Sequence, residues 1–147
     1  KMIELAVTPL LNDSKIVISN LYTNIKTLQE FEDPNEVKVV LDKDDYALYF
    51  SREPIPSRKK GFEEVPMFKQ VCVIPFMRDF LLEYNSLDQT QLEKIESVDM
   101  MRVLENGKKI KMVYIDEENC SVDTLNDLNK VIELMKNDKL MHLYLQK

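Results

Sequence analysis

The spacing of apolar side chains predicts that the chain opens with a helix followed by a strand. Apolar residues recur at helical intervals over 3–11, and the polar residues at 12–14 end that pattern. The β-branched run at 16–19 then predicts a strand. Residues 21–35 mix polar side chains with a proline, which is typical of a connection with room for one helical turn.

A β-hairpin and a buried strand are predicted in the middle of the chain. Two β-rich runs, 37–41 and 46–50, flank an aspartate-rich segment that suits a tight turn. The prolines of 51–66, together with its basic residues, predict an extended surface loop. The most apolar stretch, 67–76, is predicted to be a buried strand, and the pattern turns helical at 78–84.

Capping boxes mark the starts of two further helices. The first box, at 90–93, precedes apolar residues at helical spacing up to Gly107, which predicts one continuous helix. The second box, at 124–127, opens a helix that extends to Met135, and a strand is predicted between the two helices at 109–115. This alternation predicts an α/β fold in which a mixed sheet is flanked by helices.

Composition narrows the possible partners. The chain has 147 residues, 44% of them apolar, which is enough for one core but short for two independent domains. Its net charge of −6 excludes the basic surplus that nucleic-acid binding requires. No apolar run is long enough to span a bilayer, so we expect a cytoplasmic protein that binds neither nucleic acid nor membrane.

Carboxylates are the main candidate site residues that the pattern alone offers. Glu93, Glu96 and Asp99 are spaced three apart on one predicted helix face, where they could bind a ligand or interact with the helix dipole. Asp123 stands where a strand leads into a helix, which suits either a helix cap or a Mg²⁺ ligand. The single histidine, His142, has no visible partner for acid–base work. With two glycines in the chain, a glycine-rich phosphate loop is excluded.

Three strings carry a resemblance to a known family. Residues 33–56 contain DPNEVKVVLD followed by YALYFSREPIP, residues 91–104 contain QLEKIE followed by RVL, and residues 121–128 read SVDTLNDL. They resemble the segments NPNxVKVVLD…YALYFSRxxIP, PLExxExLEQLRxL and GVDTPEDL of the 3-deoxy-manno-octulosonate (Kdo) cytidylyltransferases, the CMP-Kdo synthetases. The resemblance runs from the first helix to about Met135 and covers nearly the whole chain.

This resemblance implies a Rossmann-like nucleotide-diphospho-sugar transferase fold and a reaction. The family joins CTP to the anomeric hydroxyl of Kdo, an acidic eight-carbon sugar, for lipopolysaccharide or surface polysaccharide biosynthesis. It implies Mg²⁺ as the cofactor, with Asp123 as a protein ligand, because this aspartate stands in the family's VDT signature. It also implies a homodimer, for which the apolar hairpin 37–50 and the strand 67–76 are the expected self-association surface.

The resemblance further assigns roles to side chains outside the metal site. Arg52 and Lys38 are the candidate catalytic cations, which would neutralise phosphate or the sugar carboxylate, with surface ion pairs as the alternative. Gln70, Asp99, Glu93 and Glu96 are the candidate substrate-binding residues.

The sugar pocket implied by the resemblance departs from the family pattern at several positions. Gln70 and Ile74 replace a sugar-contacting histidine and tyrosine, and Asp99 is a shortened acid beside a lost glutamine. Polar contacts to sugar hydroxyls set strong preferences. The departures therefore favour an amino-deoxy Kdo or another nonulosonic acid as much as Kdo itself.

The family's amino-terminal CTP loop, PAR…SxRxPxKxL, and its QGDEP string do not occur in the chain. Residues 1–147 are therefore interpreted as the carboxyl-terminal part of a single cytidylyltransferase domain, which we expect to be inactive alone. The alternative is a non-catalytic interaction domain or partner subunit derived from this fold. The reading frame upstream of Lys1 discriminates between them, because it either encodes the CTP loop or does not.

Overall fold

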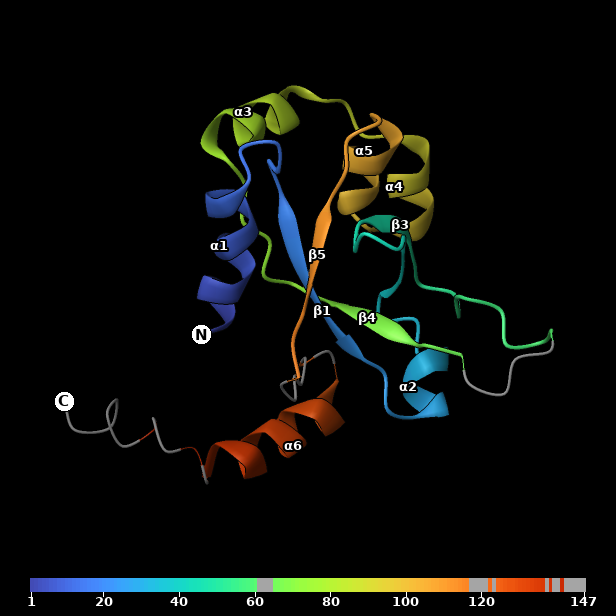
Figure 1. Ribbon diagram of the computed structural model, residues 1–147. Coiled ribbons are helices and arrows are strands. Elements are labelled where there is room, and N and C mark those ends of the chain that lie inside the picture. Colours follow the sequence, from blue (N-terminus) through green and yellow to red (C-terminus); the bar gives the residue numbers. More distant parts are fainter. Residues whose placement is uncertain (61–64, 117–121, 123, 137, 139–140, 142–147) are drawn as a thin grey trace. The chain divides into compact units, whose positions relative to one another are not determined.

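The computed structural model describes residues 1–60, 65–116, 122, 124–136, 138 and 141, and divides the chain into two compact units. The first unit spans Lys1–Glu117 and the second Glu118–Lys147. The first unit is built on a five-stranded mixed sheet with the order β3-β2-β4-β1-β5 (Figure 1). Its strands are β1 (Ser19–Asn24), β2 (Lys38–Leu41), β3 (Ala47–Ser51), β4 (Phe68–Val71) and β5 (Lys111–Tyr114).

The strand pairing explains why the sheet is mixed. β1 is antiparallel to β4 and parallel to β5, while β2 is antiparallel to both β3 and β4. The predicted hairpin is confirmed as β2 and β3, with Val39 opposite Phe50. Both of these side chains are fully buried, so this pair anchors the hairpin in the core. The predicted fold class, a mixed sheet flanked by helices, is confirmed.

Helix α1 (Met2–Asn12) covers one face of the sheet beside β1 and β5 (Figure 1). Ala6 packs there against Leu21, Val71 and Ile115 in a small apolar cluster. The hydroxyl of Ser19 donates to Ala6 O, which satisfies a carbonyl inside the α1–sheet interface. The helix ends at Asn12, as the polar run in the sequence predicts.

Helices α3 (Arg78–Ser86), α4 (Gln91–Glu96) and α5 (Met100–Glu105) cover the opposite face. This face holds the larger core, in which aromatic and sulfur-containing side chains predominate. Its buried members are Ile18, Tyr22, Val39, Ala47, Phe50, Phe80, Tyr84, Val98, Met100, Met101, Val103, Ile110 and Met112. The short helix α2 (Leu28–Glu32) begins at Thr27, whose hydroxyl accepts from Glu30 N.

The helix predicted to run unbroken from the first capping box to Gly107 is in fact two helices. Ser97 adopts a left-handed conformation with φ of 52° between α4 and α5. Two terminal carbonyls of α4, Glu96 O and Ser97 O, accept from Arg52 instead of from helical N–H groups. The prediction was wrong because apolar spacing does not register a partner that is distant in the sequence. Gly107 ends α5 with φ of 72°, as predicted.

The first strand was also predicted in the wrong place. β1 begins at Ser19 and continues to Asn24, so it lies largely in the segment predicted to be a connection. The polar residues of β1 break the apolar pattern by which a buried strand is predicted from sequence. Asn20 is nevertheless fully buried, and its side chain is hydrogen-bonded to backbone carbonyls of β1 and β4. β4 is likewise shorter than the predicted 67–76, although Val73 O and Pro75 O continue to accept from β1.

The second unit contains α6 (Leu125–Lys136). The predicted capping box is confirmed there. Asp127 Oδ2 accepts from Thr124 N at 3.0 Å, and Thr124 Oγ1 accepts from Asp127 N at 3.2 Å. Within the part of the chain that the structure describes, no helix is long and apolar enough to cross a membrane.

Candidate functional site

The carboxylate of Glu96 joins the end of β3 to α4. It accepts from the Tyr49 hydroxyl at 3.0 Å, from the Ser51 hydroxyl at 3.1 Å and from Arg52 N at 3.0 Å. These donors are three of the four residues of the YFSR string at 49–52, so the string places three donors around one acid. The contacts occupy the carboxylate and favour a structural role, while substrate binding by Glu96 stays a prediction.

Arg52 uses its guanidinium in the same junction. Nε donates to Glu96 O at 2.8 Å, Nη1 to Pro34 O at 2.9 Å and Nη2 to Ser97 O at 3.0 Å. All three nitrogens therefore bind backbone carbonyls, which tie β3 to the end of α4 and to the segment that precedes β2. An arginine held in this way is poorly placed to neutralise a phosphate, so the geometry supports structural positioning, and the predicted catalytic role is untested.

Lys38 points into a cage of backbone carbonyls. Its side chain is fully buried, and Nζ donates to Asp33 O at 2.8 Å, to Glu36 O at 2.7 Å and to Arg52 O. Burial lowers the pKa of this ammonium, although Asp33 and Glu36 oppose the shift. The ammonium has its full set of acceptors without any ligand. This geometry too favours a structural role over contact with a substrate anion.

We expect Arg52→Lys to lower the free energy of unfolding by about 1–2 kcal/mol, because a lysine cannot bind three separate carbonyls in a planar fork. Urea denaturation measures the change. The matched control is Arg78→Lys, since Arg78 is 82% exposed and forms an ion pair with its likewise exposed neighbour Asp79, so its loss should cost less than about 0.5 kcal/mol. Equal effects of the two substitutions would contradict the structural role of Arg52.

Glu93 and Arg102 form a partly buried bidentate ion pair between α4 and α5. Arg102 Nε donates to Glu93 Oε2 at 2.8 Å and Nη2 donates to Glu93 Oε1 at 2.5 Å. The arginine lowers the pKa of Glu93, and Thr90 N adds a further hydrogen bond to its carboxylate. The guanidinium also lies over the Tyr84 ring at 4.7 Å. The pair locks the two helices together, and substrate binding by Glu93 stays a prediction.

Gln70 and Asp99 differ from the other candidates in having side-chain oxygens that no described hydrogen bond occupies. Gln70 is half-buried on β4, and its Nε2 donates to Asn20 Oδ1 at 2.6 Å. Asp99 is exposed at the start of α5, and its side chain makes no capping hydrogen bond. Of the predicted substrate-binding residues in the described part of the chain, these two leave polar atoms available to a ligand. Asp123, the predicted metal ligand, lies outside the described residues.

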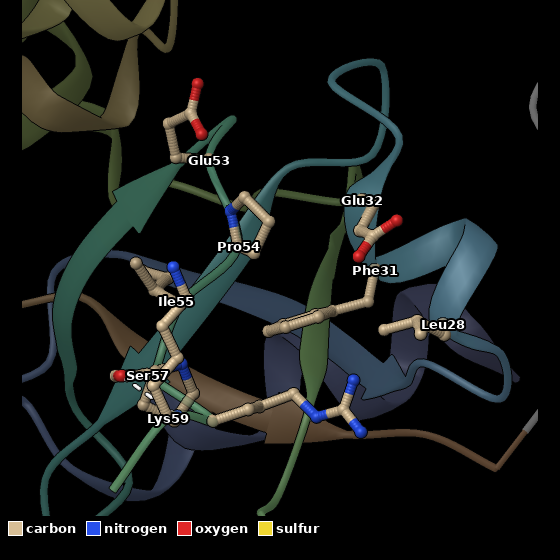
Figure 2. A pocket seen from close by; sticks show the side chains of 10 residues that line it. Leu28, Phe31, Glu32, Glu53, Pro54, Ile55, Ser57 and Lys59 are labelled. Atoms are coloured by element: carbon tan, nitrogen blue, oxygen red, sulfur yellow. Dashed lines mark hydrogen bonds between the residues drawn. The ribbon is translucent and has the colours of Figure 1, made fainter.

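A cavity of about 620 Å³ lies beside α2, and its lining begins at Glu53, directly after the predicted site residue Arg52. Figure 2 shows Leu28 and Phe31 of α2 on one side of it and the loop residues Ile55, Ser57 and Lys59 on the other. The guanidinium of Arg58 lies 5.9 Å from the centre of the Phe31 ring. The sequence predicted this loop, but not the cavity it forms with α2.

The described residues offer no cluster of three His, Cys, Asp or Glu side chains that could hold a metal ion. Mg²⁺ is commonly bound through one or two carboxylates together with substrate phosphates and water. A single carboxylate such as the predicted Asp123 is therefore chemically compatible with Mg²⁺, provided that other ligands complete the shell.

Asn20 and Lys69 are site-building residues that the sequence reasoning missed. Asn20 orients Gln70, while Lys69 Nζ contacts the carboxylates of Glu30 at 2.5 Å and Glu36 at 3.0 Å and so ties β4 to α2 and to the loop before β2. Burial alone would lower the pKa of Lys69, but the two glutamates outweigh it and raise the pKa. The available signal was the pair of polar residues, Ser19 and Asn20, set between the apolar residues Ile18 and Leu21.

Comparison with known proteins identifies the family. The family model described as Cytidylyltransferase matches residues 1–110. The chain is 42% identical over 145 residues to the 3-deoxy-manno-octulosonate cytidylyltransferase of Geotalea uraniireducens, an alignment that covers 92% of this chain and 58% of the relative. It is 38% identical over 141 residues to the protein of the same name from Fusobacterium nucleatum, covering 95% and 57%.

A solved structure gives the same result. The CMP:2-keto-3-deoxy-manno-octonic acid synthetase complexed with CTP superposes with a TM-score of 0.83 at 30% identity, over 92% of this chain and 55% of that one. The chain thus spans somewhat more than half the length of the relatives it matches. With the family model matching residues 1–110, this chain belongs to the cytidylyltransferase family, as its three motif strings predict.

Proposed function

We propose that this chain is the sugar-binding part of an enzyme that activates Kdo, or a close variant, as its CMP derivative from CTP. The observation that carries the proposal is the agreement between relatives. The Geotalea and Fusobacterium proteins have the same name, 3-deoxy-manno-octulosonate cytidylyltransferase. The structural relative was solved as a complex with CTP. Lipopolysaccharide or surface polysaccharide biosynthesis, in the cytoplasm, is the setting we propose.

Mg²⁺ is the cofactor we propose, with Asp123 as its ligand from this chain. The support is the SVDT string, which matches the family's VDT signature. When bound, the ion would screen the charges of the α-phosphate and the sugar carboxylate and favour the attacking oxyanion. The chain's own contribution is to hold the sugar, and Gln70 and Asp99 are the residues whose polar atoms stay accessible for this purpose.

The function is tested by measuring CMP-sugar formation and pyrophosphate release from CTP, Mg²⁺ and Kdo. Two samples are needed: the chain as given, and the product of the complete reading frame in which it is encoded. Turnover in either sample supports the proposal. If the complete product shows no measurable binding of CTP or Kdo, a role as a non-catalytic interaction domain becomes the better account of this chain.

The substituted sugar pocket predicts a preference for an amino sugar. Gln70 offers an amide where the family has a histidine, and exposed Asp99 offers a carboxylate that would bind a cationic amino group. We expect the 8-amino analogue of Kdo to have a kcat/KM about tenfold or more above that of Kdo, measured at matched concentrations. A tenfold preference in the opposite direction would mean that the substitutions do not set specificity.

A homodimer is part of the same proposal and is still a prediction. The hairpin expected to mediate it buries Val39, Ala47 and Phe50 within the chain's own core, which weakens the argument that a partner must cover them. Leu48 on the edge strand β3 is 59% exposed and is the apolar residue the hairpin still offers. Sedimentation at increasing concentration is the measurement that decides the oligomeric state.

A further inference from the structure

Asn20 is a buried amide in the middle of β1, and its side-chain nitrogen and oxygen both have partners. Its exposed fraction is 0%. Nδ2 donates to Leu21 O at 3.0 Å and to Val71 O at 2.7 Å, and Oδ1 accepts from Gln70 Nε2 at 2.6 Å. A reversed amide would set its oxygen against two carbonyl oxygens that cannot donate. The surrounding backbone therefore fixes which end of the Asn20 amide faces Gln70.

The orientation of Asn20 in turn fixes that of Gln70. Because Asn20 presents an oxygen, Gln70 must turn its nitrogen toward it, and Gln70 Oε1 then points away. Among the described residues, Thr90 Oγ1 is the one buried side-chain atom without a hydrogen-bond partner. Gln70 Oε1, which has no partner in that part of the chain, therefore keeps access to solvent. The half-buried Gln70 thus offers a hydrogen-bond acceptor outward.

We propose that Asn20 is a positioning residue that makes Gln70 present its side-chain oxygen, a hydrogen-bond acceptor, to the sugar. The sugar group that binds to this oxygen must then be a hydrogen-bond donor, and an ammonium group should bind in preference to a hydroxyl. The substrate part of this inference rests on the proposed function, whereas the orientation of the two amides does not. Hydrogen bonds from a charged donor are about twice as strong as those between neutral groups. An ammonium is also a donor only, whereas a hydroxyl both donates and accepts. A carboxylate or ring oxygen at the same position would meet another oxygen and be rejected.

The orientation can be tested without a ligand by placing a titratable probe at Gln70. In Gln70→Glu, the introduced carboxyl faces Asn20 Oδ1 and must keep a proton to donate, so its pKa should be raised. Adding Asn20→Leu removes that oxygen while the position stays equally buried, and the pKa should fall. Carbon-13 NMR of the carboxyl measures both. A pKa that is equal or lower in the single variant than in the double variant would overturn the orientation.

The substrate preference is tested by calorimetric titration of the chain with Kdo and its 8-amino analogue. We expect the amino sugar to bind about tenfold or more tightly, and Asn20→Ser to reduce this ratio below about threefold. Gln70→Met should also reduce the ratio of the two sugar affinities. Because Gln70 is half-buried, this variant can replace Asn20→Ser in the test if Asn20→Ser does not fold. Equal weakening of both sugars by these variants would mean a merely structural role and would overturn the positioning.

The two tests separate the inference from the proposed function. A raised pKa in Gln70→Glu, together with no binding of either sugar to the wild-type chain or to the complete gene product, would overturn the proposed function and the substrate preference with it. An unraised pKa together with sugar binding would overturn the positioning by Asn20 and leave the proposed function standing.

Discussion

On the proposed role of Asp123 as a Mg²⁺ ligand, its replacement by asparagine should reduce turnover of the proposed enzyme by on the order of 100-fold or more. A catalytic metal contributes several kcal/mol to transition-state stabilisation, and each ~1.4 kcal/mol is worth a factor of ten in rate. Asparagine keeps the shape of the side chain but removes the charge that holds a hard cation. Pyrophosphate release at increasing Mg²⁺ concentration is the measurement, and the variant should need far more Mg²⁺ than the wild type.

The control for this substitution is Asp88→Asn, which makes the same chemical change at an exposed aspartate in the loop before α4. It should leave turnover unchanged. Asparagine also serves as a helix cap nearly as well as aspartate, so Asp123→Asn should fold normally even if the residue is a cap. Full activity in Asp123→Asn, or a parallel loss of folding and activity, would count against the metal role.

Replacing Glu93 by glutamine should lower the free energy of unfolding at pH 7 by about 3 kcal/mol, because the Arg102 side chain, 15% exposed, loses its counter-charge. The two hydrogen bonds at 2.8 and 2.5 Å from Arg102 lie inside the α4–α5 junction, where little water can replace the lost carboxylate. Urea denaturation measures the difference. Glu83→Gln is the matched control, since Glu83 pairs with Lys108 at a half-exposed site and should cost less than about 1 kcal/mol.

The same pair predicts how stability depends on pH. Arg102 lowers the pKa of folded Glu93 below the ordinary value of 4.5, so the stability from this group is fully present above that value. It is lost as the pH falls through the lower pKa of the folded state. The difference in stability between wild type and Glu93→Gln should therefore shrink below pH 4.5. A difference that stays constant from pH 7 into this acidic range would contradict the pairing.

Local signals in the sequence predicted the elements that local chemistry determines. The Thr124 and Asp127 capping box, the hairpin turn and Gly107 each act on neighbouring residues, so a short window contains the whole cause. The failures lie where the cause is distant. Ser97 breaks the predicted helix because Arg52, 45 residues away, takes the carbonyl that would have continued it. Asn20 is accommodated in a buried strand because its side-chain amide donates a hydrogen bond to the backbone carbonyl of Val71, 51 residues away.

The candidate site shows the same limit in its chemistry. Charge and spacing identified Glu93 and Glu96 as acids worth considering, but they could not tell that each already has a full set of donors from this chain. Gln70 was singled out because it departs from the family pattern, and the structure adds the reason that its amide has a fixed orientation. A carboxylate's partners decide whether it can bind a ligand, and those partners are set by tertiary packing.

Lys38 also helps to set the register of the β2–β3 hairpin during folding. Side chains alternate between the faces of a strand, so sliding β2 by one residue would exchange the positions of Lys38 and Val39. The ammonium would then enter the aromatic core beside Phe50, and a valine would face the three carbonyls that Lys38 now satisfies. Both errors are costly, because one buries an unpaired charge and the other leaves buried acceptors empty. Lys38 therefore adds a second penalty against a slip to the one that the buried Val39–Phe50 pair already imposes.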